Sequence, residues 1–319
     1  MEPIVLVSRP VFPDLVEPLT SSNEVRFLDD PEDPDEWRRA LPEVDALLCQ
    51  LTDTLDAERL RAGRRLRVIS TISVGTDHID LVAARAMGIQ VTHTPGVLTE
   101  STADFTFALL LAVARRVVEG DRFVRDGRWT RWELDLLCGR DLHGATLGII
   151  GAGRIGRAVA RRARGFGMRL LYAQRRRLDT EVERDLALEW STLDGLLEQA
   201  DFVSLHAPLT EETHHRIGAR ELERMKPTAF LINTARGPLV DEVALADALE
   251  VGTIAGAGLD VFEREPMVEP RLVTRTDVVL APHLASASIA TRRRMASMAI
   301  EDLGAVLAGG TPRHPVPAP

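Results

Sequence analysis

The chain has 319 residues, which suits two domains of roughly 100 to 200 residues each. Its apolar content of 45% and charged content of 27% are those of a globular protein, and no segment approaches the roughly 20 consecutive apolar residues of a membrane span. The net charge of −9 argues against nucleic acid as a partner, because such proteins need clustered positive charge.

The amino terminus lacks the basic, apolar and small-residue regions of a signal peptide, so we expect a cytoplasmic protein. Cys49 and Cys138 have no CxxC spacing and no evident metal partner. We therefore expect two buried free thiols and no metal site.

The first part of the chain alternates apolar strand-like runs with stretches of helical periodicity. This alternation predicts a parallel sheet wrapped by helices. The expected strands are Ile4–Val7, Val25–Leu28, Ala46–Cys49, Val68–Ile72 and Gln90–Thr92. A long helix is predicted over Ser101–Glu119, after Pro95 and Gly96 and ending at Gly120, as a helix joining two domains would be.

The second part repeats the alternation and predicts a six-stranded doubly wound sheet. Its expected strands are 147–150, 168–173, 202–205, 229–233, 256–260 and 278–281, with a helix over Ile155–Phe166 after the first of them. A last helix is predicted over Ile289–Leu307, followed by a proline-rich end, 312–319, that we expect to be frayed.

A glycine turn of the form GxGxxG follows the buried strand LGII and opens a helix. Gly151 permits the tight turn, Gly153 lets the backbone approach a pyrophosphate, and Gly156 lets the helix pack on the strand. The helix amino terminus, with Arg154 and Ile155, would bind the phosphates. The context predicts a dinucleotide site.

The end of the next strand indicates which dinucleotide binds. An NAD site usually has an acidic residue there for the ribose hydroxyls, but Tyr172-Ala173 runs into Gln174, Arg175, Arg176 and Arg177, and the first acid is Asp179. Guanidinium groups at this position would bind a 2′-phosphate. We therefore expect NADP(H) as the preferred cofactor. The alternative is that the arginines are merely solvated and the site binds NAD(H).

Three further clusters fall at the carboxyl ends of predicted strands, where open α/β sheets bind ligands. They are Asn233 to Gly237, Gly258 to Pro266 and Ala281 to His283. With VGTDHID at Val74 to Asp80 and TPGVLTESTAD at Thr94 to Asp104, they resemble the D-isomer-specific 2-hydroxyacid dehydrogenases, in the right order from about Leu47 to Ser288. The run CGRDLHGATLGIIGAGRIG and the arginine turn look most like the glyoxylate and hydroxypyruvate reductase branch.

Reduction of a 2-keto acid needs a cation for the carboxylate, a proton donor for the carbonyl oxygen and a well-placed hydride. Arg236 can supply the cation and polarise the carbonyl, and His283 is the expected acid. A carboxylate beside the imidazole favours its protonated form and fixes the ring, a role expected of Glu265. The matching Arg, Glu and His have these roles in the family.

Each catalytic residue has a structural alternative. His283 could be a satisfied histidine at a strand end, Glu265 competes with Glu263, and Arg236 could merely pair with a neighbouring acid. His214 and His215 are expected to face solvent.

The resemblance implies an α/β fold of two doubly wound, Rossmann- or flavodoxin-like domains with the active-site cleft between them. The substrate domain would comprise residues 1–98 and 288–319, so that the last helix completes it, and the dinucleotide-binding domain residues 99–287. The substrate-binding residues implied are Leu51, Val74, Gly75, Trp132, Arg236, His283 and Ser286. The cofactor residues implied, besides the glycine turn and Gln174 to Arg176, are Thr102, His206, Ala207, Pro208, Thr213, Thr234, Ala235, Asp260, His283 and Ala285.

Two implied features have alternatives. The loop at Val74 and Gly75, expected to offer backbone N–H groups to the carboxylate, could also lead into a helix capped by Thr76 or Asp77. Trp129 and Trp132 lie in a segment that in relatives packs on a second subunit, which implies a homodimer, with internal aromatic packing as the alternative.

The expected reaction is NAD(P)H-dependent reduction of glyoxylate or hydroxypyruvate to the D-2-hydroxy acid. A sugar keto acid or phosphohydroxypyruvate is the alternative substrate, although no basic cluster in the first domain suggests a phosphorylated one. A dinucleotide-sensing binding protein, like the corepressors that share this fold, is the alternative from another functional class.

Overall fold

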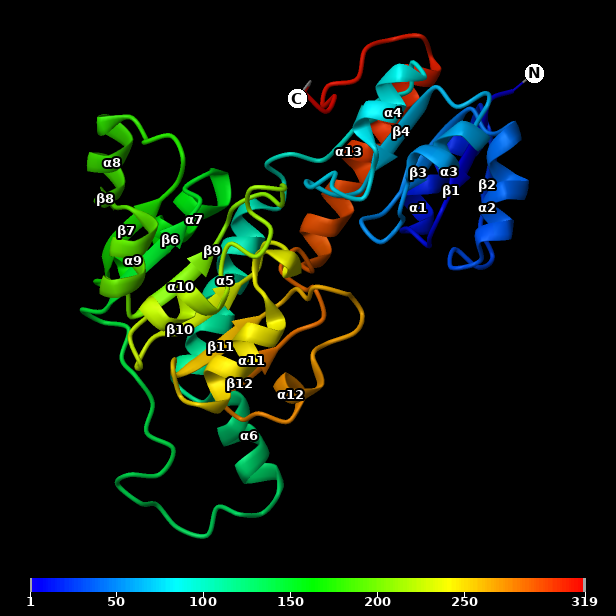
Figure 1. Ribbon diagram of the computed structural model, residues 1–319. Helices are drawn as coiled ribbons and strands as arrows, with labels where there is room; N and C mark the ends of the chain where they lie inside the picture. Colours follow the sequence, from blue (N-terminus) through cyan, green and yellow to red (C-terminus); the bar gives the residue numbers. More distant parts are fainter. Residues whose placement is uncertain (1, 318–319) are drawn as a thin grey trace. The chain divides into compact units, whose positions relative to one another are not determined.

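The computed structural model describes residues 2–317 and divides into two compact units (Figure 1). The first unit comprises residues 1–98 and 288–319, and the second comprises residues 99–287. In the described part of the chain no helix combines the length and the apolar character needed to cross a membrane.

The first unit contains a five-stranded parallel sheet with strand order β2-β1-β3-β4-β5. Val5 of β1 lies opposite Val25 of β2 and Ala46 of β3 in the register. The central strands are buried on both faces, as expected for a parallel sheet covered by helices. The bounds confirm the expected strands: β1 Ile4–Val7, β2 Glu24–Phe27, β3 Ala46–Cys49, β4 Val68–Thr71 and β5 Gln90–Thr92.

Helices of the first unit cover both faces of this sheet. One core layer joins Leu6, Leu47 and Ile69 to Trp37 and Leu60. The opposite layer joins the other faces of the strands to the last helix, and Ser70 Oγ donates a 2.7 Å hydrogen bond to Ala299 O. In Figure 1 this helix, α13, lies beside β4. The helices are α1 Pro13–Val16, α2 Pro34–Ala40, α3 Ala57–Ala62, α4 Leu81–Ala86 and α13 Ile289–Leu307, with 3-10 turns at Glu17–Ser21 and Leu41–Glu43.

The proline-rich end is not frayed over its described residues, so that expectation is wrong. Val316 N donates to Val91 O at 2.8 Å, and His93 N donates to His314 O at 3.1 Å. Asp302 also accepts from Arg313 N at 2.7 Å. The first two bonds attach the tail to the edge strand β5, which has no other neighbour on that side in the described sheet, and the third attaches it to α13. Residues 318–319 lie outside the described part.

The second unit contains a seven-stranded parallel sheet with strand order β12-β11-β10-β9-β6-β7-β8. The six expected strands are present, but β8 was missed, because its three residues LEW carry too short a pattern. The doubly wound α/β class is confirmed. The strands are β6 Thr146–Ile150, β7 Arg169–Ala173, β8 Leu188–Trp190, β9 Phe202–Leu205, β10 Phe230–Asn233, β11 Gly256–Leu259 and β12 Val278–Leu280.

Helices again cover both faces. Helices α5 and α7 pack with Leu147, Ile149 and Tyr172 on one face, and α9, α10 and α11 pack with Ile150 and Leu171 on the other. Successive strand residues point to opposite layers, as the alternation of side chains requires. The helices are α5 Thr99–Ala114, α6 Val117–Arg125, α7 Arg154–Gly165, α8 Thr180–Leu186, α9 Leu193–Gln199, α10 Ala219–Arg224, α11 Glu242–Glu250 and α12 Pro270–Val273, with a 3-10 turn at Gly237–Leu239.

The long helix expected to end at Gly120 is broken earlier. Arg116 adopts a left-handed conformation with φ 54°, and Gly120 lies inside α6. The Ala114 carbonyl accepts from Arg140 N at 2.8 Å, and Gly139 lies so near that a Cβ there would be 2.3 Å from Ala114 O. The helical path therefore breaks at Arg116, and Arg140, which is distant in sequence, binds the carbonyl of the last residue of α5.

The expectation of two buried thiols is half wrong. Cys49 is buried on β3, and burial raises the pKa of its thiol, but Cys138 is exposed. Cys138 lies in the segment 126–145, which has neither helix nor strand to build a core around it.

Candidate active site

The glycine turn between β6 and α7 has the geometry that a pyrophosphate requires. Gly151 has φ 94°, and a Cβ there would lie 2.7 Å from the carbonyl of His206 and the nitrogen of Ala207. A Cβ on Gly156 would lie 2.2 Å from Gly151 O, whereas a Cβ on Gly153 would meet no atom within 4 Å. Gly151 and Gly156 thus allow close packing, and Gly153 leaves open space before the helix.

Helix α7 begins at Arg154, and no side chain caps its amino terminus. The first backbone N–H groups of a helix have no partner within the helix and favour an anion. The turn therefore fits the diphosphate of a dinucleotide, with Arg154 and Ile155 in its first turn.

Gln174 connects this turn to the arginine run after β7. Its Oε1 accepts from Ala152 N at 2.9 Å, and its Nε2 donates to Arg176 O at 2.6 Å. Arg175 is 89% exposed and forms a 3.4 Å ion pair with Glu212. Gln174 carries no charge that would repel a phosphate, and Arg175 and Arg176 project from the surface beside it.

Arg177 has a different role from the two arginines before it. Its guanidinium binds both oxygens of Glu183, at 2.8 and 2.9 Å, and Tyr172 donates to the same carboxylate. The bonds from Arg177 and Tyr172 lower the pKa of Glu183 to about 2. Arg177 thus ties the turn to α8. Glu183 is not distinguished from other helix carboxylates by any sequence pattern, so its role was not expected.

The proposed catalytic side chains follow three neighbouring strands, β10, β11 and β12. His283 Nδ1 lies 2.9 Å from Glu265 Oε2, and Glu265 Oε1 accepts from Phe262 N at 3.1 Å. Glu263 points instead to His215, with 2.5 Å between Oε1 and Nε2. Glu265 therefore pairs with His283 and Glu263 with His215, so His215 does not simply face solvent as expected.

The charge around Glu265 keeps it ionised. Burial alone would raise the pKa of Glu265, but the hydrogen bond and charge of His283, the N–H of Phe262 and the charge of Arg236 lower it below its ordinary value. His283, Phe262 and Arg236 therefore all stabilise the ionised form of the Glu265 carboxylate.

Asp260 holds the loop that carries His283. Its two oxygens accept from Leu284 N at 2.6 Å and Ala285 N at 2.8 Å, and its carbonyl accepts from His283 N at 2.8 Å. These bonds support the left-handed conformation of His283, with φ 53°. Burial raises the pKa of Asp260, although the two backbone donors oppose this.

The Arg236 turn and the Glu265 loop are in close contact. A Cβ on Gly237 would lie 1.9 Å from the carbonyl carbon and oxygen of Phe262, so only glycine fits there. Glu242 at the start of α11 accepts from Glu263 N at 2.5 Å and Glu269 N at 3.2 Å, and burial raises its pKa. Gly237 was expected only as part of the cluster Asn233 to Gly237, and Glu242 was not expected at all, because a contact between distant loops leaves no local pattern.

Several predicted cofactor residues come together around α5. Thr106 Oγ1 donates to Thr102 O at 2.8 Å and lies 2.9 Å from Thr234 Oγ1. Ser101 Oγ donates to Ala285 O at 3.1 Å. Thr102, Thr234 and Ala285, which are far apart in the chain, are thus linked, and Ala235 and Ser286 adjoin them in sequence.

The predicted residues after β9 lie beside the glycine turn. His206 and Ala207 contact Gly151, and Thr213 Oγ1 donates to Pro208 O at 2.7 Å. Burial lowers the pKa of His206 to about 3, so the ring is neutral, and its Nε2 lies 2.8 Å from Ser204 Oγ.

The remaining predicted substrate residues belong to other segments. Leu51 follows β3, and Val74 and Gly75 follow β4 in the first unit, where Ser73 Oγ donates to Gly75 O at 2.7 Å. Trp132 lies in the segment 126–145 of the second unit and is 74% exposed. Their contacts with substrate stay predictions.

The helix expected to be capped by Thr76 or Asp77 is α4, and its cap is Asp80, whose Oδ1 accepts from Ala83 N at 2.8 Å. Ile79 N bonds to Thr76 O in a turn that delays the helix. The Val74–Gly75 loop is also held by His93, whose Nδ1 lies 3.0 Å from Val74 O.

Residues 107–285 match the family described as "D-isomer specific 2-hydroxyacid dehydrogenase, NAD binding domain". The chain belongs to the D-isomer-specific 2-hydroxyacid dehydrogenase family. As a member of this family it is an oxidoreductase that uses a nicotinamide dinucleotide.

Relatives named glyoxylate reductases match most of the chain. A glyoxylate reductase of Korarchaeum cryptofilum is 56% identical, covering 85% of this chain and 82% of its own. A glyoxylate reductase of Thermococcus litoralis is 46% identical over 98% of this chain and 96% of its own. The solved NADPH-dependent glyoxylate/hydroxypyruvate reductase of Sinorhizobium meliloti, in complex with NADP and malonate, has a TM-score of 0.89 at 35% identity, covering 99% of this chain and 97% of its own.

Proposed function

We propose that the protein reduces glyoxylate to glycolate or hydroxypyruvate to D-glycerate, with NADPH as the preferred donor and NADH as the alternative. The observation that carries this is the 2.9 Å pair of Glu265 and His283, whose carboxylate also interacts with the charge of Arg236. A proton donor and a cation at one place are what a 2-keto acid needs for reduction. Relatives that are glyoxylate reductases, at 46 to 56% identity, support the choice of substrate.

The nicotinamide supplies a hydride to the carbonyl carbon when it is bound. Arg236 binds the substrate carboxylate and polarises the carbonyl with its planar guanidinium. His283 donates a proton from Nε2 to the carbonyl oxygen, because Nδ1 is directed to Glu265. Glu265, ionised over the neutral range, holds the imidazole ring in place through Nδ1.

The preference for NADPH rests on the turn after β7. Gln174 occupies the place of the acid that would bind a ribose hydroxyl and repel a 2′-phosphate. Arg175 and Arg176 are exposed beside it, while Arg177 is held by Glu183. An exposed ion pair such as that of Arg175 with Glu212 stabilises little, so Arg175 can exchange it for a phosphate.

We propose that the protein forms a homodimer through the segment 126–145. It exposes Trp129, Trp132 and Leu134 to 56, 74 and 83%. Large apolar side chains gathered on one exposed segment are typical of an interface. The alternative of internal aromatic packing does not fit these exposures.

The decisive experiment is a steady-state panel of 2-keto acids, assayed with NADPH and with NADH. We expect the highest kcat/KM with glyoxylate or hydroxypyruvate and NADPH. A sugar keto acid or phosphohydroxypyruvate as the best substrate would change the assignment within the family, and no turnover with any keto acid would contradict an enzymatic role.

A further inference from the structure

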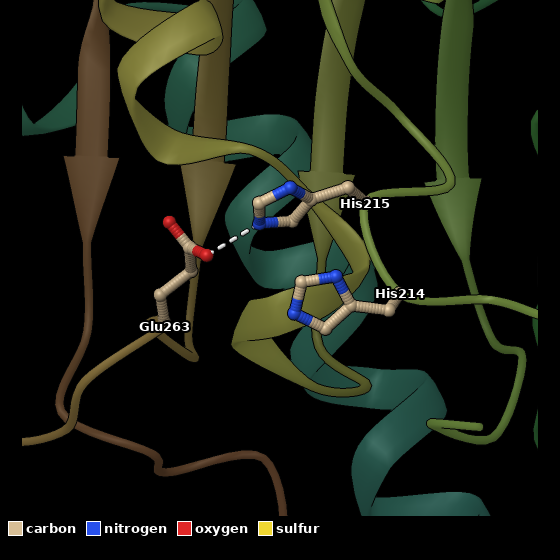
Figure 2. A group of neighbouring side chains, drawn as sticks. All are labelled: His214, His215 and Glu263. Atoms are coloured by element: carbon tan, nitrogen blue, oxygen red, sulfur yellow. Dashed lines mark hydrogen bonds and ion pairs between the residues drawn. The ribbon is translucent and has the colours of Figure 1, made fainter. Parts of the chain in front are cut away.

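Two adjacent histidines and a glutamate form a cluster that the proposed reaction does not use. His214 and His215 lie in the loop between β9 and α10, and Glu263 follows β11. One ligand atom of each residue lies within 4.8 Å of those of the other two. Figure 2 shows both rings on the same side of their loop, facing the Glu263 carboxylate.

The backbone sets this arrangement. His215 has φ 48°, a left-handed conformation that is uncommon outside glycine, and its N–H donates to Pro238 O at 2.8 Å. The turn brings the two rings to a centroid distance of 4.1 Å with planes tilted by 32°. Adjacent residues therefore present their ring nitrogens to one place.

Carboxylates lie on both sides of the His215 ring, Glu263 within hydrogen-bond distance and Asp241 beyond it. Nε2 lies 2.5 Å from Glu263 Oε1, while Nδ1, on the other side of the ring, lies 3.9 Å from Asp241 Oδ2. A histidine that binds a metal through one nitrogen usually directs the other to a carboxylate or carbonyl. Glu263 is itself fixed, because Oε2 accepts from Glu242 N at 3.3 Å.

We propose that His214, His215 and Glu263 form a binding site for a divalent ion of the zinc class. Two imidazoles and one carboxylate suit Zn²⁺ or Ni²⁺ better than Mg²⁺ or Ca²⁺, which take oxygen ligands. Ligands around zinc lie about 3.3 Å from one another, given bonds of about 2.0–2.2 Å, so a small rotation of the side chains closes the site. Water would complete the coordination, since the side chain of His215 is 37% exposed.

The site was not expected from the sequence, because Glu263 lies 48 residues from His215. An ion there would connect the loop after β9 with the loop after β11, which carries Glu265 two residues on. Binding to the folded state alone raises the resistance to unfolding. The inference stands apart from the proposed reductase activity.

The test uses the full chain without a histidine tag, freed of metal by chelation and titrated with zinc chloride in a calorimeter. We expect one ion per chain and a rise in the thermal midpoint. His214→Ala, which leaves the His215–Glu263 pair intact, should weaken binding at least about tenfold, and so should Glu263→Gln. The matched control is His143→Ala, which removes an exposed histidine outside the cluster.

The second readout is the electron paramagnetic resonance spectrum of bound Cu²⁺. We expect coupling to two imidazole nitrogens in the wild type and to one in His214→Ala. Absence of binding with either ion, or binding that His214→Ala and Glu263→Gln leave unchanged, would overturn the inference.

Discussion

His283 is held by Glu265, with 2.9 Å between Nδ1 and Oε2, while the neighbouring Glu263 is committed to His215. One ring nitrogen of His283 thus faces a carboxylate that is ionised at neutral pH. The proton transfer proposed above takes place at the other nitrogen, Nε2.

Replacing His283 with Ala should lower kcat by about 10²- to 10⁴-fold, the usual effect of losing a general acid. Glu265→Gln should lower kcat by a smaller factor, because the amide can still orient the ring through Nδ1 but carries no negative charge. Stopped-flow and steady-state rates with glyoxylate would measure both. The exposed Glu223→Gln serves as control, and unchanged turnover in His283→Ala would refute the assigned role.

Gly237→Ala should reduce activity although it replaces no catalytic side chain. The new Cβ would lie 1.9 Å from the Phe262 carbonyl and displace the loop that carries Glu265. Overpacking of this kind costs about 1–3 kcal/mol in stability. The matched control, Gly120→Ala within α6, has open space and should raise stability by about 0.5–1 kcal/mol. Equal thermal midpoints and rates in the two variants would contradict the close contact.

Neutral substitutions of Arg175 and Arg176 should weaken NADPH binding by about 10- to 100-fold, since a hydrogen bond to a charged group contributes about 1.5–3 kcal/mol. The affinity for NADH should change little, because it has no 2′-phosphate. Fluorescence titration of both cofactors would measure this. Arg184→Gln, on the exposed side of α8, is the control, and equal losses for the two cofactors would mean that these arginines do not bind the 2′-phosphate.

His206 should make the protein less stable in acid. Its pKa is about 3 in the folded state against 6.5 as the ordinary value, so between these pH values the unfolded chain binds more protons. The free energy of unfolding therefore falls as pH decreases from 6.5, by at most about 1.4 kcal/mol per pH unit from this group. Urea midpoints across this range should depend less on pH in His206→Asn than in the wild type. The exposed His143→Ala should keep the wild-type dependence, and the same slope in all three proteins would exclude the effect.

Replacing Trp132 and Leu134 with Ser should weaken self-association by at least about tenfold. The reason is that large side chains buried in an interface contribute most of its binding energy. Sedimentation velocity over a range of protein concentrations would show the shift from dimer to monomer. Val251→Ser alters an equally exposed residue of α11's carboxyl end and should leave association unchanged. A wild-type protein that stays monomeric would contradict the dimer.

Elements with a strong local pattern were predictable. Ala46–Cys49, Gln90–Thr92 and Ile289–Leu307 have the bounds expected from apolar runs and helical spacing, and the glycine turn was evident from the strand before it and the helix after it. These patterns depend on residues a few positions apart, so the sequence by itself determines them.

Only the tertiary structure decided which residues far apart in the chain come into contact. Helix α5 ends at Ala114, whose carbonyl accepts from the distant Arg140 N, although the helical pattern continues to Gly120. The choice of Glu265 over Glu263 as partner of His283 depends on Gly237 and Glu242, which hold the connecting loop. The sequence by itself determines which side chains can react. Hydrogen bonds and close contacts between segments far apart in the chain depend on the order in which the strands pair in the sheet, because that order sets which loops become neighbours.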